Sequence, residues 1–183
     1  MVEYSPLRRR PNGFTLVELL IVVAIIGVIA AIAVPGLLRA RMSGNEASAI
    51  GSMRAVNSAQ ASYSSACANG GYAITLNDLA SPPTGTPVAF ISPDLGSNGI
   101  VKSGYTQTMA KDAAAGVTDI GTPAATCNGS VSQPATSYYA SAVPTSPGST
   151  GTRYFATDKR GTIFGDSAAA IPNPIPGTAV SVQ

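Results

Sequence analysis

The sequence predicts an α+β fold in which one long N-terminal helix packs against a small antiparallel β-sheet. Two observations predict the helix: an uncharged apolar run over residues 19–38, and an apolar stripe with helical spacing after Gly44. A third observation predicts the sheet. Beyond Gly70 the composition changes to Gly, Ser, Thr and Pro with short apolar segments, which is typical of short strands separated by turns.

The apolar run has the length of a membrane-spanning helix. It reads LLIVVAIIGVIAAIAVPGLL and contains no charged or hydroxyl side chain. At about 1.5 Å per residue it extends roughly 30 Å as a helix, which is the thickness of the hydrocarbon core of a bilayer. Three arginines, Arg8, Arg9 and Arg10, precede it. The positive-inside rule therefore places the N-terminus in the cytoplasm and the bulk of the chain outside.

One carboxylate, Glu18, stands directly before the apolar run. An ionised side chain within a membrane helix costs about 2.5–3.5 kcal/mol on insertion scales, so its presence calls for a reason. An unpaired carboxylate at this position is most easily understood if another molecule supplies a cation.

The segment from Arg8 to Pro35, RRRPNGFTLVELLIVVAIIGVIAAIAVP, resembles the N-terminus of type IV prepilins. The resemblance implies a leader peptide over residues 1–13, which a prepilin peptidase cuts after Gly13. It also implies N-methylation of the new N-terminal residue, Phe14. Finally, it implies that Glu18 neutralises the terminal amine of a neighbouring subunit during assembly.

Two ordinary explanations remain beside this one. A secretory signal has a basic head and a cleavage site such as Ala31-Ile32-Ala33, but its apolar stretch is shorter, about 7–15 residues, and Glu18 does not fit it. A plain single-pass anchor explains the length and orientation of the run. It leaves Glu18 and the Gly13–Phe14 junction without a role.

We expect a helix that begins near Phe14 and stops at Gly70-Gly71. Its first half, residues 14–43, is expected in the membrane or in a filament core. Its amphipathic half, residues 44–70, supports a head formed by residues 71–183. The apolar stripe of that second half consists of Ala47, Ile50, Met53, Val56, Ala59, Tyr63 and Cys67.

Two residues predict irregularity in the apolar half. Pro35 removes a backbone donor, so we expect a kink or local unwinding near residues 31–36. Gly27 lowers the local helix propensity. The resemblance implies that the segment between Gly27 and Pro35 can melt as subunits leave the bilayer.

Five short segments of the head are predicted as strands. The last two flank a polar loop that ends in Gly161, which predicts a hairpin. We also expect a long loop over residues 80–99 and a poorly ordered tail from Ile171 onward. The predicted strands are Val88–Ile91, Gly104–Met109, Ser137–Val143, Tyr154–Thr157 and Thr162–Phe164.

The sequence contains two cysteines, Cys67 and Cys127, both in the part predicted to lie outside the membrane. In an oxidising compartment a disulfide between them is the natural interpretation, and two separate buried thiols are the alternative. Two cysteines without any histidine do not make a zinc site.

Composition argues against nucleic-acid binding and catalysis. Without residues 1–13 the chain keeps eight basic and eight acidic side chains, so it lacks the surplus of cations that a nucleic-acid binder shows. There is no histidine and no phosphate-binding loop, so we expect neither an enzyme nor a cofactor. Asp158 and Asp166 flank the predicted hairpin. They could share a calcium ion, but backbone capping and solubility are the favoured roles.

We therefore expect a structural subunit of a type IV pilus-like filament, first a precursor in the bacterial inner membrane and then extracellular. The resemblance implies further copies of the chain in a helical filament, a platform membrane protein and a cytoplasmic assembly ATPase, with roles in adhesion, motility or secretion. The alternatives are a low-copy minor pilin, a pseudopilin of a type II secretion system, and a monomeric membrane-anchored extracytoplasmic binding domain. Only the last predicts a function that survives Glu18→Ala.

Overall fold

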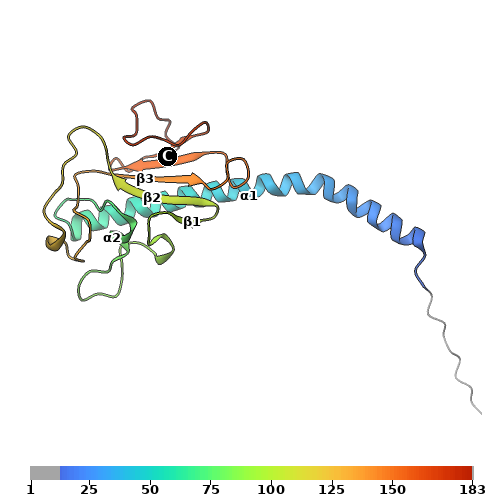
Figure 1. The fold of residues 1–183 in the computed structure, drawn as a ribbon, viewed down its shortest axis with the longest axis horizontal. Helices are drawn as coiled ribbons and strands as arrows, with labels where there is room; N and C mark the ends of the chain where they lie inside the picture. Colours follow the sequence, from blue (N-terminus) through green and yellow to red (C-terminus); the bar gives the residue numbers. More distant parts are fainter. Residues whose placement is uncertain (1–12, 183) are drawn as a thin grey trace, which may run out of the picture. The chain divides into compact units, whose positions relative to one another are not determined.

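A computed structural model describes residues 13–182. The predicted leader, up to Asn12 and with its three arginines, lies outside the described residues. The structure divides into two units that meet between Arg39 and Ala40, and we describe each by itself. Helix α1 (Leu16–Ala66) contributes to both units (Figure 1).

The first unit is the apolar half of α1. One stretch of this helix reaches a mean hydropathy of 3.0, and none of that stretch is buried within the chain. By length and composition the helix is able to cross a membrane. The helix continues past Gly27 and Pro35, so no local unwinding is found near residues 31–36, and the expected kink stays a prediction. A single proline removes one backbone donor, and the neighbouring turns keep the helix intact.

In the second unit, the amphipathic half of α1 packs against the head with a slightly different stripe from the predicted one. Ala47, predicted to face the core, is exposed. Met53, Val56, Ala59, Tyr63 and Cys67 are buried as predicted. The buried residues of α1 are Glu46, Ala49, Ser52, Met53, Val56, Ala59, Gln60 and Tyr63. Only Ala47 and Ile50 are displaced by one residue, to Glu46 and Ala49. The predicted stripe contained apolar residues alone, whereas Glu46 and Gln60 are polar side chains with partners in the head.

The helix ends earlier than predicted. The last α1 residue is Ala66, and the N–H of Gly70 then donates to the carbonyl of Ser64 at 2.9 Å. Gly70 has a φ of +90°, a conformation that a residue with a side chain rarely adopts. This hydrogen bond joins residues six apart and closes a turn beyond Ala66, so the glycine ends the turn after the helix rather than the helix itself.

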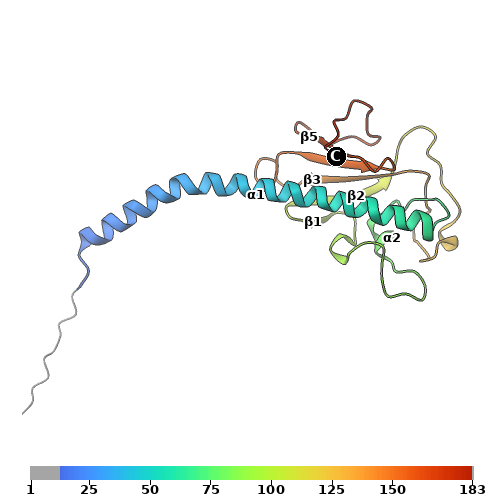
Figure 2. The same ribbon diagram turned by 180° about the vertical axis from the view of Figure 1, so that it is seen from behind.

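The predicted antiparallel sheet is confirmed. Its five strands lie in sequence order, each antiparallel to the next (Figures 1 and 2). Four predicted strands coincide with observed ones, including the predicted hairpin. The strands are β1 (Ile100–Lys102), β2 (Tyr105–Lys111), β3 (Tyr138–Pro144), β4 (Tyr154–Asp158) and β5 (Ile163–Asp166).

The predicted strand Val88–Ile91 is wrong, and three short helical elements were not predicted. Instead of pairing in a ladder, Phe90 and Ile91 donate their N–H groups to the carbonyl of Leu79. This apolar segment thus packs on a short helix that follows α1. The short elements are α2 (Leu76–Ala80), η1 (Pro93–Leu95) and η2 (Pro123–Ala125).

One face of the sheet covers the buried stripe of α1 (Figure 2). Alternate residues of each strand point toward the helix, as the pleat requires. Together they form the main core of the head. Its largest fully buried side chains include Met53, Val56, Tyr63, Tyr105, Tyr138, Phe155 and Ile163.

The other face of the sheet is covered by the C-terminal segment, so the expectation of a poorly ordered tail is wrong. Ile171 and Ile175 are buried against Ala156 and Phe164 in a second, smaller core. The hydroxyl of Tyr139 donates to the carbonyl of Ile171. Further along, residues 180–182 exchange backbone hydrogen bonds with β5 and so occupy its free edge. The tail is held because its isolated apolar residues fit a face that the helix leaves uncovered.

Candidate assembly site

The N-terminal end of the described chain presents the predicted processing junction without any cover. Gly13 and Phe14 precede the first residue of α1, and both are exposed. The side chain of Phe14 keeps 84% of its accessible surface. A peptidase that approaches this junction therefore meets no steric obstacle within the described chain.

Glu18 forms a capping box with Thr15 at the start of α1. The carboxylate accepts hydrogen bonds from the Thr15 N–H at 2.9 Å and from its hydroxyl at 2.6 Å. In return, the Glu18 N–H donates to the Thr15 hydroxyl oxygen at 3.2 Å. Each residue thus satisfies a backbone donor that the first turn of a helix leaves free.

Thr15 was not among the predicted site residues, although the pattern Thr-x-x-Glu before an apolar run is a known signature of a helix start. The box fixes the carboxylate beside the first residues of the helix, where the helix dipole also favours a negative charge. Since the backbone N of Thr15 directly follows Phe14, an amine on Phe14 would be close to the same carboxylate. The assembly role of Glu18 stays a prediction.

Beyond Glu18, the side chains of the first unit form an uninterrupted apolar surface. All of the large apolar residues from Leu19 to Leu38 are exposed, mostly with half or more of their surface accessible. This surface is far larger than the apolar patches that monomeric soluble proteins expose. It therefore requires a lipid or protein environment. The roles of Gly27 and Pro35 as flexible points within it stay predictions.

The second unit contains the predicted disulfide. Cys67, just after the end of α1, is bonded to Cys127, which lies beyond η2. The N–H of Cys127 also donates to the carbonyl of Cys67 at 3.2 Å. The disulfide thus ties the end of the long helix to the loop that leads into β3.

Polar side chains of α1 fasten the helix to the turns of the sheet. Glu46 accepts hydrogen bonds from the N–H and hydroxyl of Thr152, both at 2.8 Å, and forms an ion pair with Arg153. Burial would raise the pKa of Glu46, but these hydrogen bonds outweigh it and hold the pKa below its ordinary value. Asn57 accepts hydrogen bonds from the hydroxyls of Tyr138 and Thr157.

The structure does not bring Asp158 and Asp166 together as a calcium site. They lie at opposite ends of the β4–β5 hairpin. Asp158 pairs with Arg160, and Asp166 accepts the N–H groups of Ala168 and Ala169, so both carboxylates already have partners. Within residues 13–182 no group of three or more acidic or cysteine side chains is placed to hold a metal ion.

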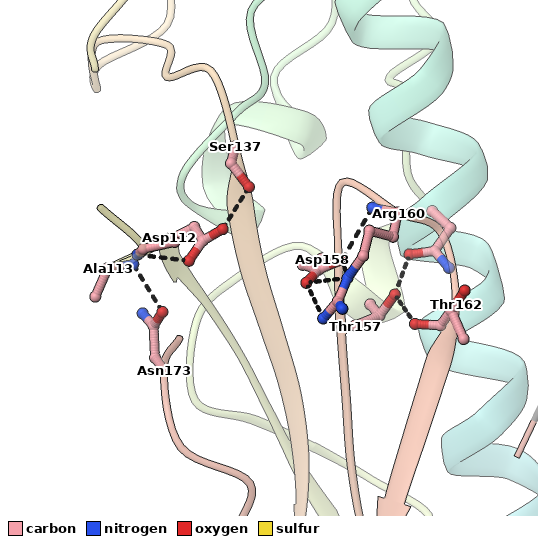
Figure 3. A network of polar contacts seen from close by, with 10 residues as sticks. Asp112, Ala113, Ser137, Thr157, Asp158, Arg160, Thr162 and Asn173 are labelled. Carbon is pink, nitrogen blue, oxygen red and sulfur yellow. Dashed lines mark hydrogen bonds and ion pairs between the residues drawn. The ribbon is translucent and has the colours of Figure 1, made fainter. Parts of the chain in front are cut away.

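A polar network joins the end of β2 and the start of β3 to the C-terminal segment (Figure 3). Asp112 accepts hydrogen bonds from the hydroxyl of Ser137 at 2.6 Å and from the N–H of Ala114 at 2.9 Å. Asn173 bridges the carbonyl of Lys111 and the N–H of Ala113, which pins the tail to the end of β2. The network is therefore structural, because its acceptors are occupied by donors of the same chain.

Comparison with known proteins identifies the N-terminal segment. Residues 8–34 match the family model of the prokaryotic N-terminal methylation motif. The chain carries the N-terminal methylation motif and is similar to type IV major pilins.

Two such relatives are the type IV major pilin protein PilA of Myxococcus xanthus and the type IV wide pilus major component PilA4 of Thermus thermophilus. The chain is 45% identical to the first over 62 residues, which are 34% of this chain and 28% of that protein. It is 55% identical to the second over 38 residues, which are 21% of this chain and 29% of that protein. The chain thus aligns with less than a third of either relative. No solved structure matches it.

Proposed function

We propose that the chain is a non-catalytic structural subunit of a type IV pilus-like filament. The observation that carries the proposal is the methylation motif at the head of a fully exposed apolar helix. The two relatives support a pilus rather than a secretion apparatus, because both are major components of pili by name. The head, with its disulfide and two cores, supplies the outer surface of the filament.

Maturation begins in the inner membrane. A prepilin peptidase cuts after Gly13 and removes the leader, residues 1–13, and Phe14 then becomes the N-methylated N-terminus. Cleavage matters for packing, because three arginines at the start of the helix would otherwise enter the apolar core of the filament. Burying such charges without partners is strongly unfavourable.

Assembly then exchanges lipid for protein contacts around residues 14–43. The exposed apolar side chains of one subunit pack against those of its neighbours, and the amine of one Phe14 neutralises Glu18 of another. The energy for extraction comes from a cytoplasmic ATPase acting through a platform membrane protein. In the filament, residues 44–70 connect this core to the heads.

Substitution of Glu18 tests the proposal. We expect Glu18→Ala to be processed after Gly13 but to enter filaments poorly, because a buried amine would remain without its carboxylate. Asp94→Asn is the control, since it removes an exposed carboxylate of the head and should leave processing and fibre yield unchanged. Normal fibre yield from Glu18→Ala, with normal amounts of processed protein in the membrane, would refute the assembly role.

A further inference from the structure

Two arginines, Arg39 and Arg41, follow directly after the apolar part of α1. Both are exposed, and the nearest charged residue before them in the sequence is Glu18. If the apolar run spans the membrane with the leader inside, these arginines emerge at the outward-facing surface. The positive-inside rule disfavours cations on that side, so a compensating interaction is to be expected there.

The described residues offer no carboxylate that is free to pair with Arg39 or Arg41. Each of the eight carboxylates within residues 13–182 already accepts a hydrogen bond or forms an ion pair inside the chain. Four of the eight basic side chains in the same range are ion-paired, namely Lys102, Lys111, Arg153 and Arg160. Arg39 and Arg41 belong to the other four, so within the described residues neither is ion-paired, and their exposed guanidinium groups are accessible to an anion of another molecule.

We propose that Arg39 and Arg41 bind the phosphate groups of phospholipids in the outward-facing leaflet before assembly. This inference rests on the proposed function, because it requires the apolar half of α1 to span the membrane. Phosphate is the anion found at the depth where the apolar run ends. The planar guanidinium group matches phosphate with two parallel hydrogen bonds, and its long stem allows the charge to reach the headgroup layer.

The proposed contact of Arg39 and Arg41 with phosphate gives the removal of the leader a second consequence. Before cleavage, cations flank the apolar run on both sides, with Arg8, Arg9 and Arg10 on the cytoplasmic side. After cleavage the only side-chain cations next to the run are Arg39 and Arg41 on the outer side. The phosphate contacts of Arg39 and Arg41 then oppose inward movement of the mature helix, and they must be released when the subunit is extracted outward.

The test measures how fast the unassembled full-length chain leaves donor vesicles for acceptor vesicles. In phosphatidylglycerol vesicles, Arg39→Gln with Arg41→Gln should transfer faster than the original chain, roughly fivefold for each arginine removed, as expected for a basic side chain near an anionic surface. Arg54→Gln with Lys159→Gln changes the charge equally within the head and should leave the rate unchanged. Arg39→Lys with Arg41→Lys should restore most of the slow transfer.

A second arm separates phosphate from general interfacial anchoring. In vesicles of digalactosyldiacylglycerol, which contains no phosphate, the difference between the original chain and the double glutamine variant should disappear. Equal transfer rates in phosphatidylglycerol, or an undiminished difference in the galactolipid, would overturn the inference. A chain that fails to associate with either vesicle would instead contradict the membrane step of the proposed function.

Discussion

The carboxylate of Glu18 accepts both the N–H and the hydroxyl hydrogen of Thr15, at 2.9 and 2.6 Å. A group predicted to wait for the amine of a neighbour is thus already satisfied within its own chain. In the proposed assembly, the amine of a neighbouring Phe14 would join or replace the donors of Thr15. The capping box satisfies the carboxylate and holds it beside the first turn of α1, which is the position that the proposed exchange requires.

Thr15 is accordingly expected to influence assembly. Thr15→Val keeps the shape of the side chain but removes the hydroxyl, which weakens the first turn by about 1 kcal/mol and frees the carboxylate to move. We expect a clear decrease in fibre yield for Thr15→Val, while Thr15→Ser stays near the original level. Yields are compared by immunoblot of sheared fibres at equal amounts of processed protein. If valine and serine variants assemble equally well, the hydroxyl has no part in positioning Glu18.

The lowered pKa of Glu46 predicts that the head loses stability at acid pH. Its folded-state pKa lies below the ordinary value of 4.5, so its contribution is present above that pH and is lost as the pH falls through the lowered pKa. Glu46→Gln should reduce the free energy of unfolding by about 1–3 kcal/mol at neutral pH and should flatten its decline below pH 4.5. Chemical denaturation at a series of pH values measures both effects.

Asp94 provides the control for Glu46. It forms an ion pair with Lys102 in which both side chains are substantially exposed. Exposed pairs contribute about 0–1 kcal/mol, so Asp94→Asn should have a much smaller effect at neutral pH. If Glu46→Gln and Asp94→Asn reduce the free energy of unfolding equally, the hydrogen bonds from Thr152 do not make Glu46 more stabilising than an exposed ion pair.

The disulfide is expected to stabilise the head by restricting the unfolded chain. Cys67 and Cys127 are 60 residues apart, and closing a loop of this size is worth about 4 kcal/mol in the chain-entropy model. Cys67→Ser with Cys127→Ser should therefore lower the free energy of unfolding by about 2–4 kcal/mol. Thermal and chemical unfolding under oxidising conditions measure the loss. Addition of a reductant should weaken the original protein but leave the double variant unchanged.

The unpaired side-chain amide of Gln107 predicts that an apolar substitution at this position stabilises the protein. Its side chain is fully buried on the helix-facing side of β2, and neither amide atom has a hydrogen-bond partner within the described chain. Gln107→Met keeps the length of the side chain and removes the cost of an unpaired amide. We expect a gain of about 1–3 kcal/mol in the free energy of unfolding.

Gln60 is the matched counterpart of Gln107. It is equally buried, but its amide donates to the carbonyl of Ala73 at 2.7 Å and accepts the N–H of the same residue at 3.0 Å. Gln60→Met should thus destabilise the protein, because two backbone groups of Ala73 lose their partner. A loss of stability in both methionine variants would contradict the distinction between them.

The sequence was sufficient to predict the long helix, the antiparallel sheet and the β4–β5 hairpin, because each depends on local patterns. The apolar run and the three-and-four spacing are intrinsic to one segment, and the hairpin depends on its turn. Val88–Ile91 and Ile100–Lys102 show the limit of such patterns. Both are short apolar segments, and only the tertiary partners decide that the second pairs with β2 while the first packs on α2.

Buried polar residues were the other source of error. Glu46 and Gln60 belong to the helix face that packs on the head, but their partners, Thr152 and Ala73, are distant in sequence or lie beyond the helix. A pattern of apolar residues cannot reveal such pairs. Thr15 is different, since its partner is three residues away and the capping-box pattern was readable in the sequence.

The most direct test of the account is mass spectrometry of the N-terminal peptide from fibres sheared off the cell surface. We expect an abundant peptide that begins with N-methylated Phe14. The opposite result would be a protein recovered only from the membrane as single copies, with Arg8, Arg9 and Arg10 still attached.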